Sequence, residues 1–169
     1  MTTRHWSTRT ETPTDIPAVR EIVLAAFDTP EEADLVDALR TDSAWLPGLS
    51  MVATDPSDTP IAHALLTRCH IGDTPALCLA PVAVLPQHQS TGAGHAVTTA
   101  LLHAAAEQGE QFVVVLGHPH YYPRFGFRNA LANGIRLSID IPADALMALS
   151  LTSAPLPTGT VRYAPPFGI

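Results

Sequence analysis

The sequence predicts an α/β fold in which helices cover both faces of a central sheet, and three observations support this prediction. Short β-branched and apolar runs of strand length alternate with longer segments whose apolar residues recur at helical spacing. Glycine, proline and aspartate mark boundaries between these segments. The 169 residues are enough to bury a sizeable core without disulfides or metals, so we expect one domain over residues 1–169.

The elements are expected in the order β-α-α-β-β-β-α-β-α-β-β. Strands are predicted at His5–Thr10, Leu49–Thr54, Ile61–Cys69, Ala76–Leu85, Phe112–Leu116 and Ala145–Leu151. The first helix follows an N-cap at Thr14–Asp15, and the second starts at Thr29, which is expected to form a capping box with Glu32. The third and main helix runs to about Gln108, and Gly109 stands where a C-terminal glycine cap is expected.

The charge of the chain limits its partners. The net charge is −7, and the nine basic residues are scattered arginines. A nucleic-acid surface needs a basic stripe, so a cationic or small-molecule partner is favoured. No apolar run reaches the ~18 residues of a membrane span and no signal peptide is evident, so we expect a cytoplasmic protein without membrane contact. Cys69 and Cys78 flank a predicted hairpin turn at diagonal positions, and we expect reduced thiols there.

The stretch 82–94 holds the most informative local pattern. A strand leads through a glycine-containing turn into a helix, and the free N–H groups and dipole of such a helix start attract anions. A phosphate-binding P-loop needs a lysine, and this chain has none. A dinucleotide-binding turn is excluded because six residues separate Leu85 from Gly92, and Val97 replaces its third glycine. The pattern that remains is Gln-x-x-Gly-x-Gly, at Gln89, Gly92 and Gly94.

With this pattern the chain resembles the GNAT superfamily of N-acetyltransferases, whose acetyl-CoA pyrophosphate loop reads Gln/Arg-x-x-Gly-x-Gly/Ala. A second block, Gly117–Phe127, matches a strand followed by a short helix that ends in Tyr-x-x-x-Gly-Phe, here Tyr122, Gly126 and Phe127. Together with residues 79–84, the blocks look most like the YhbS-like predicted N-acetyltransferases of bacteria. The resemblance covers most of the chain.

The resemblance implies a GNAT-like mixed sheet, mostly antiparallel, of six to seven strands with a splay between the fourth and fifth strands. It also implies acetyl-CoA (coenzyme A) as cosubstrate without a metal, and it is compatible with a homodimer. By similarity, the pantetheine arm lies along Val82, Ala83 and Val84, and the pyrophosphate lies over Gln89, Ser90, Thr91, Gly92, Ala93 and Gly94. Pro81 supports this placement, because a proline inside a strand marks a bulge or an unpaired stretch.

One departure from the family concerns the phosphates. Ser90 and Thr91 stand where the family commonly has glycine and then arginine or lysine. No permanent positive charge lies between Val82 and Gly109, so we expect weak, salt-sensitive cofactor binding through backbone amides and the helix dipole. Protonated His88 or His95 could add to it.

The resemblance assigns Tyr122 to the departing thiolate, with Tyr121 as the alternative. A phenol with a pKa near 10 holds its proton more tightly than a thiol near 8.5, so a hydrogen bond to the thiolate is expected rather than full proton transfer. No acidic residue occurs between Asp73 and Glu107, which leaves His118, His120, His63 or water as the base. His118 and His120 lack a third metal ligand at recognisable spacing.

The sequence therefore predicts an N-acetyltransferase that acetylates a primary amine of a small molecule or peptide in a ternary complex. The alternatives are a non-catalytic acyl-CoA-binding sensor or adaptor, and acyl transfer to a hydroxyl or from a longer acyl chain. The acidic group that by resemblance lies on the acceptor side is either a solvated helix face or an attractor for a cation. It comprises Asp28, Glu31, Glu32, Asp34 and Asp37. The acceptor itself is not predicted, because variable loops build acceptor pockets.

Overall fold

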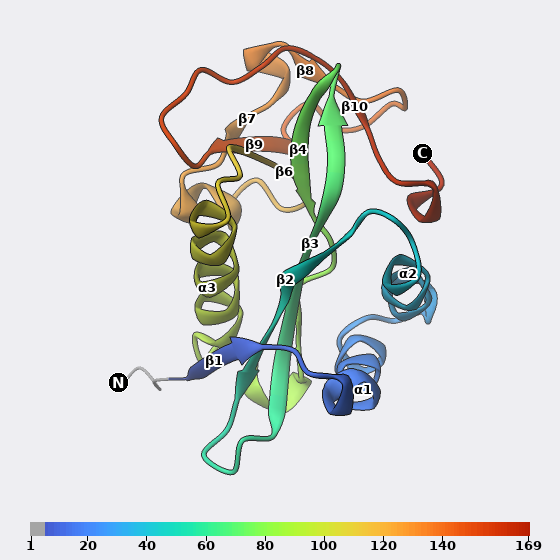
Figure 1. Ribbon diagram of the computed structural model, residues 1–169, viewed down its shortest axis with the longest axis vertical. Coiled ribbons are helices and arrows are strands. Elements are labelled where there is room, and N and C mark those ends of the chain that lie inside the picture. The colour runs from blue at the N-terminus through green and yellow to red at the C-terminus, as the bar shows by residue number, and fades with distance from the viewer. Residues whose placement is uncertain (1–5) are drawn as a thin grey trace.

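The computed structural model describes residues 6–169 and contains one mixed, mostly antiparallel sheet (Figure 1). Its main path has the order β1-β2-β3-β4-β6-β9-β7. The bounds are β1 Ser7–Thr10, β2 Trp45–Thr54, β3 Pro60–Ile71, β4 Thr74–Leu79, β6 Phe112–Leu116, β7 Arg128–Asn129 and β9 Leu146–Ser150. Off this path, β5 (Ala83–Val84) and β10 (Gly159–Arg162) pair with β3, and β8 (Ile135–Arg136) pairs with β10.

The predicted fold class is confirmed, but the described residues form ten strands rather than six to seven. The difference comes from β5, β7 and β8, which have two residues each and are too short to leave an alternating pattern in the sequence. The β4–β6 and β8–β10 pairs are parallel, and the other pairs are antiparallel.

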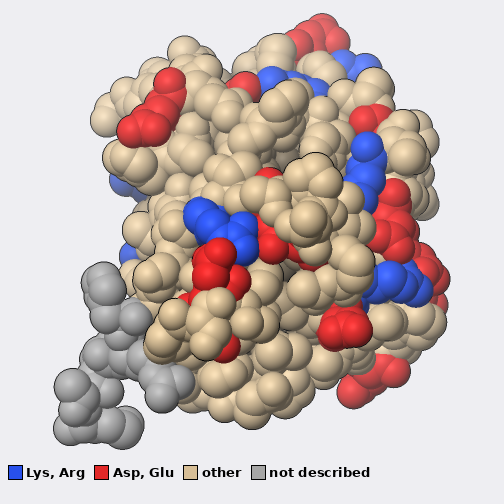
Figure 2. Space-filling model, turned by 60° about the horizontal axis from the view of Figure 1, so that its bottom comes forward, with Lys and Arg blue, Asp and Glu red and all other residues tan. Residues whose placement is uncertain are grey.

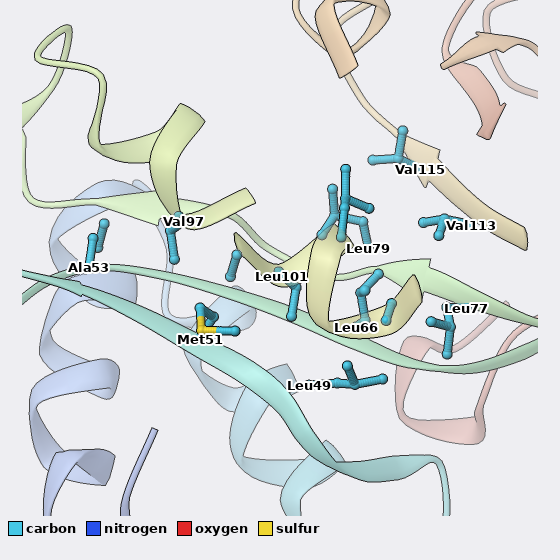
Figure 3. Close-up of a cluster of buried hydrophobic side chains, with 14 of the residues drawn as sticks. Leu49, Met51, Ala53, Leu66, Leu77, Leu79, Val97, Leu101, Val113 and Val115 are labelled. Atoms are coloured by element: carbon cyan, nitrogen blue, oxygen red, sulfur yellow. The ribbon is translucent and has the colours of Figure 1, made fainter. Parts of the chain in front are cut away.

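Helices cover both faces of the sheet, as predicted. Helix α3 (Ala93–Glu107) lies on one face, and α1 (Ile16–Ala26) and α2 (Glu31–Arg40) lie on the other (Figure 1). Successive residues of a strand point to opposite faces. Met51 therefore joins Val97 and Leu101 of α3 in one buried cluster (Figure 3), whereas its neighbour Val52 joins the cluster under α1 and α2. No helix of residues 6–169 is long and apolar enough to cross a bilayer.

The two helix starts differ in how well they were predicted. Helix α1 begins at Ile16 with Asp15 as its N-cap residue, as predicted. The carboxylate of Asp15 does not cap α1, because it accepts a 2.7 Å hydrogen bond from the backbone N–H of Thr12, at the start of a 3-10 turn (Pro13–Asp15) that precedes α1. The predicted capping box at Thr29 is wrong, because α2 begins at Glu31 and the Thr29 hydroxyl donates to the Glu32 carboxylate instead of capping the backbone. His5, the predicted first residue of β1, lies outside the described residues.

Cys69 and Cys78 are free, as predicted. Cys69 lies opposite Ala76 and Thr67 lies opposite Cys78 in the β3–β4 hairpin, so the two thiols are diagonal neighbours.

A bulge at Pro81 splits the strand predicted at Ala76–Leu85 into β4 and β5. Leu79 lies opposite Leu66 of β3, but Ala83 lies opposite His63, so four steps along β4–β5 match three along β3. The strand bends at this extra residue. Pairing between β4 and β6 ends at Cys78, and β5 pairs with β3 alone. The strands predicted as fourth and fifth therefore separate here, which is the predicted splay.

Candidate functional site

The turn before α3 contains two residues with left-handed backbone. Ser90 has φ 61° and Gly92, the N-cap of α3, has φ 88°. Glycine adopts this conformation without steric cost, whereas serine does so with strain. The first N–H groups of α3 have no partner within the helix, so they remain available to an anion.

Trp6 anchors this turn from the first strand's side of the molecule. Its indole Nε1 donates to the backbone oxygen and to the hydroxyl of Thr91, at 3.2 and 3.1 Å, and its ring packs edge-on against His88. The Thr91 hydroxyl donates in turn to the backbone oxygen of His88. The side chain at position 91 is thereby directed into the protein, so only its backbone remains to meet a phosphate.

The backbone of β5 faces the gap left by the splay. The N–H of Leu85 donates to the oxygen of Ile61 on β3 at 2.9 Å. Alternate residues of a strand direct their backbone groups to opposite sides. The backbone groups of Val84 and Val82 therefore point away from β3, where an extended amide-bearing chain could pair with them, although the Val84 oxygen also accepts a 3.3 Å hydrogen bond from Nε2 of Gln89.

A cavity of about 590 Å³, called here the loop cavity, joins this backbone to the turn. Of the residues predicted to bind the cofactor, it is lined by Val82, Val84, Gln89, Ser90, Gly92 and Gly94. The remaining three do not line it: Ala83 and Ala93 are buried in the two cores, and Thr91 is engaged with Trp6.

The tyrosine block forms the opposite wall. Tyr122–Phe125 is a 3-10 turn that ends at Gly126 with φ 98°, and Phe127 then turns into the core with its ring 5.8 Å from that of Tyr122. A Cβ on Gly117 would lie 2.7 Å from Cε2 of Tyr122. Gly117 thus lets the ring of Tyr122 lie directly against the backbone. Burial raises the pKa of Tyr122 to about 12, so this phenol is protonated at neutral pH.

The two tyrosines occupy different places. Tyr121 lines the loop cavity, and a Cβ on Gly94 would lie 3.3 Å from its hydroxyl. Tyr122 lines the loop cavity and also a second cavity.

Arg124 also lines the loop cavity, and the sequence analysis did not anticipate it. Its Nε donates to the backbone oxygen of Tyr121 at 2.7 Å, and its guanidinium lies 4.2 Å from the centre of the Tyr121 ring. Its terminal amino groups make no hydrogen bond within residues 6–169. Arg124 therefore brings a permanent positive charge to the cavity. The prediction considered only the segment 82–109, which contains no such charge.

The three candidate histidine bases are far from equivalent. His118 and His120 are both exposed, but only His118 lines the two cavities. His63 is fully buried, with Nε2 2.8 Å from the Ser50 hydroxyl and no partner for Nδ1 among the described residues. Burial, and to a lesser extent the charge of Arg40, lowers the pKa of His63 to about 3.

The second cavity, called here the aromatic cavity, has a volume of about 540 Å³ and lies on the side of α2 and the C-terminal segment. It shares Phe27, Val82, His118 and Tyr122 with the loop cavity, so the two are continuous. Its remaining walls include Leu35, Tyr163 and Phe167, with the last two rings 5.1 Å apart. None of these three residues was a predicted site residue, and only the helical spacing of Leu35 gave any signal of its orientation.

The acidic group divides in two. Acidic side chains gather along the right-hand edge of Figure 2, the side on which α1 and α2 lie in Figure 1, with arginines between them. Arg20 pairs with Asp34 and Asp37 at 3.0 and 2.6 Å. Glu32 lines the aromatic cavity and has no ion pair within the described chain. Most of the group is thus a helix face, and one member faces a cavity.

Within the part of the chain that the structure describes, no group of three or more His, Cys, Asp or Glu side chains is arranged to hold a metal ion.

A family model described as the acetyltransferase (GNAT) family matches residues 16–127. The uncharacterized N-acetyltransferase YjhQ of Escherichia coli K12 is 34% identical over 175 residues, which cover 98% of this chain and 96% of YjhQ. The uncharacterized N-acetyltransferase YhbS of the same strain is 32% identical over 130 residues, or 76% of this chain and 77% of YhbS.

Two solved structures are similar over nearly the whole length. Escherichia coli YhbS, crystallised in complex with CoA, has a TM-score of 0.87 and 26% identity, covering 97% of this chain and 92% of that one. A GNAT family acetyltransferase from Brucella melitensis, solved in complex with acetyl-CoA, has a TM-score of 0.79 and 28% identity, covering 96% of this chain and 98% of that one.

Proposed function

Because the chain belongs to the acetyltransferase (GNAT) family, we propose that it moves the acetyl group of acetyl-CoA to a primary amine of a small molecule or peptide by direct attack in a ternary complex. The observation that carries this proposal is the junction of the two cavities. Phe27, Val82, His118 and Tyr122 line both, so a thioester in one cavity can meet an amine in the other.

The loop cavity takes the cosubstrate. The amides of the pantetheine arm pair with the backbone of Val82 and Val84, and each such hydrogen bond contributes about 0.5–1.5 kcal/mol. The pyrophosphate lies over the N–H groups between Gln89 and Gly94 at the start of α3. Arg124 supplies the positive charge that this loop lacks. The site requires no metal, and the residues fit CoA through backbone donors, one guanidinium and an open strand edge.

In the reaction, the nitrogen of the neutral amine attacks the carbonyl carbon of the thioester. A C–N bond forms, the C–S bond breaks, and the electron pair leaves on sulfur. Tyr122 donates a hydrogen bond to the developing thiolate. Its pKa of about 12 lies well above that of a thiol near 8.5, so the phenol stabilises the thiolate without giving up its proton.

The attacking nitrogen also loses a proton. His118 is the proposed acceptor, directly or through water, because it is the one candidate histidine that lines the junction. His63 is excluded from this role by its complete burial. The thiolate takes up a proton from solvent when CoA leaves.

The test is release of free thiol from acetyl-CoA in the presence of an amine panel, with Tyr122→Phe and Tyr121→Phe compared as matched variants. We expect amine-dependent release whose kcat falls about a hundredfold or more in Tyr122→Phe, since one donor to a developing charge is worth about 2.7–4 kcal/mol. A larger loss in Tyr121→Phe would reassign the donor. CoA binding by calorimetry without thiol release under any amine would instead identify an acyl-CoA sensor or adaptor.

A further inference from the structure

The walls of the aromatic cavity restrict the acceptor. The apolar lining comes from three separate places: Phe27 and Leu35 at α1 and α2, Leu116 at the end of β6, and Tyr163 and Phe167 near the C-terminus. Leu116 is 43% exposed although it belongs to a buried strand, so an apolar surface is left open at the cavity. A ligand that covers this surface gains from burying apolar area of its own.

The charge of the aromatic cavity also restricts which acceptors can bind. Among the side chains of the described residues that line it, Glu32 is the one carboxylate, and no arginine is present. Glu32 is half-buried and receives a hydrogen bond from the Thr29 hydroxyl at 3.1 Å. A carboxylate attracts a protonated amine and repels an anion, and both effects grow as the site is shielded from water. An acceptor that carries a carboxylate has no cation to receive it there.

The shape fixes the order of these parts. The reacting nitrogen belongs at the junction with the loop cavity, near His118 and Tyr122, and the rest of the molecule extends into the apolar part. A volume of about 540 Å³ accommodates a small molecule with one ring, within the usual range for ligand sites.

We infer that the acceptor is a small primary amine with a single positive charge, an aromatic or branched apolar body, and no carboxylate. This inference rests on the proposed acetyl transfer, since it assigns the substrate class of the same site. Glu32 attracts the ammonium form, which releases one proton to solvent to give the neutral amine that attacks, and the aromatic walls hold the body. Neither Glu32 nor the aromatic side chains take part in bond making.

The experiment compares amines that each lack a feature of the inferred acceptor. Thiol release from acetyl-CoA is measured with 2-phenylethylamine, with phenylalanine, which adds a carboxylate, with ethanolamine, which lacks the apolar body, and with 1,4-butanediamine, which has a second charge in place of the ring. We expect kcat/KM for 2-phenylethylamine to exceed each of the others by about tenfold or more, the factor expected from one charge-assisted contact or one buried ring.

Glu32→Gln and Glu31→Gln form a matched pair, because both residues lie in the first turn of α2 but Glu31 is exposed. Glu32→Gln should lower kcat/KM for 2-phenylethylamine about tenfold, with Glu31→Gln within about twofold of the parent protein. Phe167→Ala should raise KM for 2-phenylethylamine and leave KM for acetyl-CoA unchanged.

A second readout separates this inference from the transferase proposal. 2-Phenylethylamine is titrated by calorimetry into the protein saturated with CoA. Binding without thiol release supports the cavity assignment and overturns the transferase. Equal or better turnover of phenylalanine or ethanolamine, or a lower KM for a peptide beginning with phenylalanine, overturns the cavity assignment and keeps the transferase. Absence of both binding and turnover overturns the assignment.

Discussion

The loop cavity and the aromatic cavity meet at Tyr122 and His118, but they are built in different ways. The loop cavity depends on backbone: a bulge, a turn with two left-handed residues, and the free N–H groups of a helix start. The aromatic cavity depends on side chains from segments as far apart as Phe27 and Phe167. The first is therefore suited to a ligand whose own amides pair with backbone, and the second to a ligand that matches the shape and charge of its side-chain walls.

The largest expected effect comes from substituting one glycine in the wall of each cavity: Gly117 in the aromatic cavity and Gly94 in the loop cavity. Gly117→Ala would place a Cβ 2.7 Å from the ring of Tyr122 and displace it from the junction. We expect kcat to fall about a hundredfold, because misplacing a reacting group by about 1 Å has costs of this order. The affinity for CoA, measured by calorimetry, should stay within about twofold.

The control is Gly94→Ala, whose Cβ would lie 3.3 Å from the Tyr121 hydroxyl and 3.4 Å from Val84. This variant should weaken CoA binding more than it lowers kcat. If both alanines reduced CoA affinity alike, the two cavities could not be treated as separate sites.

A second test addresses the pairing of β3 with β5, the strand that lies next to both cavities. His63 lies on β3 directly opposite Ala83 of β5. Its folded pKa of about 3 is below the unfolded value near 6.5, so its contribution to stability is present above pH 6.5 and is lost as the pH falls toward 3. When the pH is lowered from 7 to 5, the contribution of this histidine should lower the free energy of unfolding by about 2 kcal/mol.

Urea unfolding at both pH values measures this loss. The double variant His63→Leu with Ser50→Ala removes both hydrogen-bonding partners, and it should lose about 2 kcal/mol less than the parent between pH 7 and pH 5. Ser50→Ala alone keeps the titrating ring and serves as control. An equal pH dependence in the parent and the double variant would mean that the imidazole is not held neutral.

The smallest expected effect concerns the charge of the loop cavity. Arg124→Gln should raise the Kd of CoA about five- to tenfold at low salt, because the guanidinium lines the cavity proposed for the phosphates and has no carboxylate partner among the described residues. The difference from the parent should shrink in about 0.5 M salt, where the Debye length falls to a few ångströms. Arg128→Gln is the matched control, since that exposed arginine does not line the loop cavity. A salt-independent loss would indicate packing on Tyr121 instead of charge.

The parts of the loop cavity are close together in the sequence. Gln89, Gly92 and Gly94 stand in one turn, and Pro81, which indicated the bulge, lies eight residues before Gln89. Arg124 was not predicted because it comes from the tyrosine block, and only the packing of the 3-10 turn brings it to the loop cavity. The splay, the helix faces and the order of the main strands followed from pattern and resemblance together.

The aromatic cavity could not be predicted in this way. Tyr163 and Phe167 carry no periodic signal, and their relation to Phe27 exists only after the C-terminal segment packs against α2. The capping box of α2 was predicted wrongly for a smaller reason. Thr29 and Glu32 bond to each other through their side chains, and such an alternative differs from a capping box by only about 1 kcal/mol.

The extra residue at Pro81 makes the whole arrangement depend on one step of chain length. Without it, the number of residues between Leu79 and Ala83 would equal the number between their partners on β3. The ladder would then run on without interruption. The backbone groups of Val82 would then meet β6, and the sheet would close over the space that the pantetheine arm is proposed to fill. Deleting the codon for Pro81 would keep every side chain of the turn before α3 and would still convert an open site into a continuous sheet.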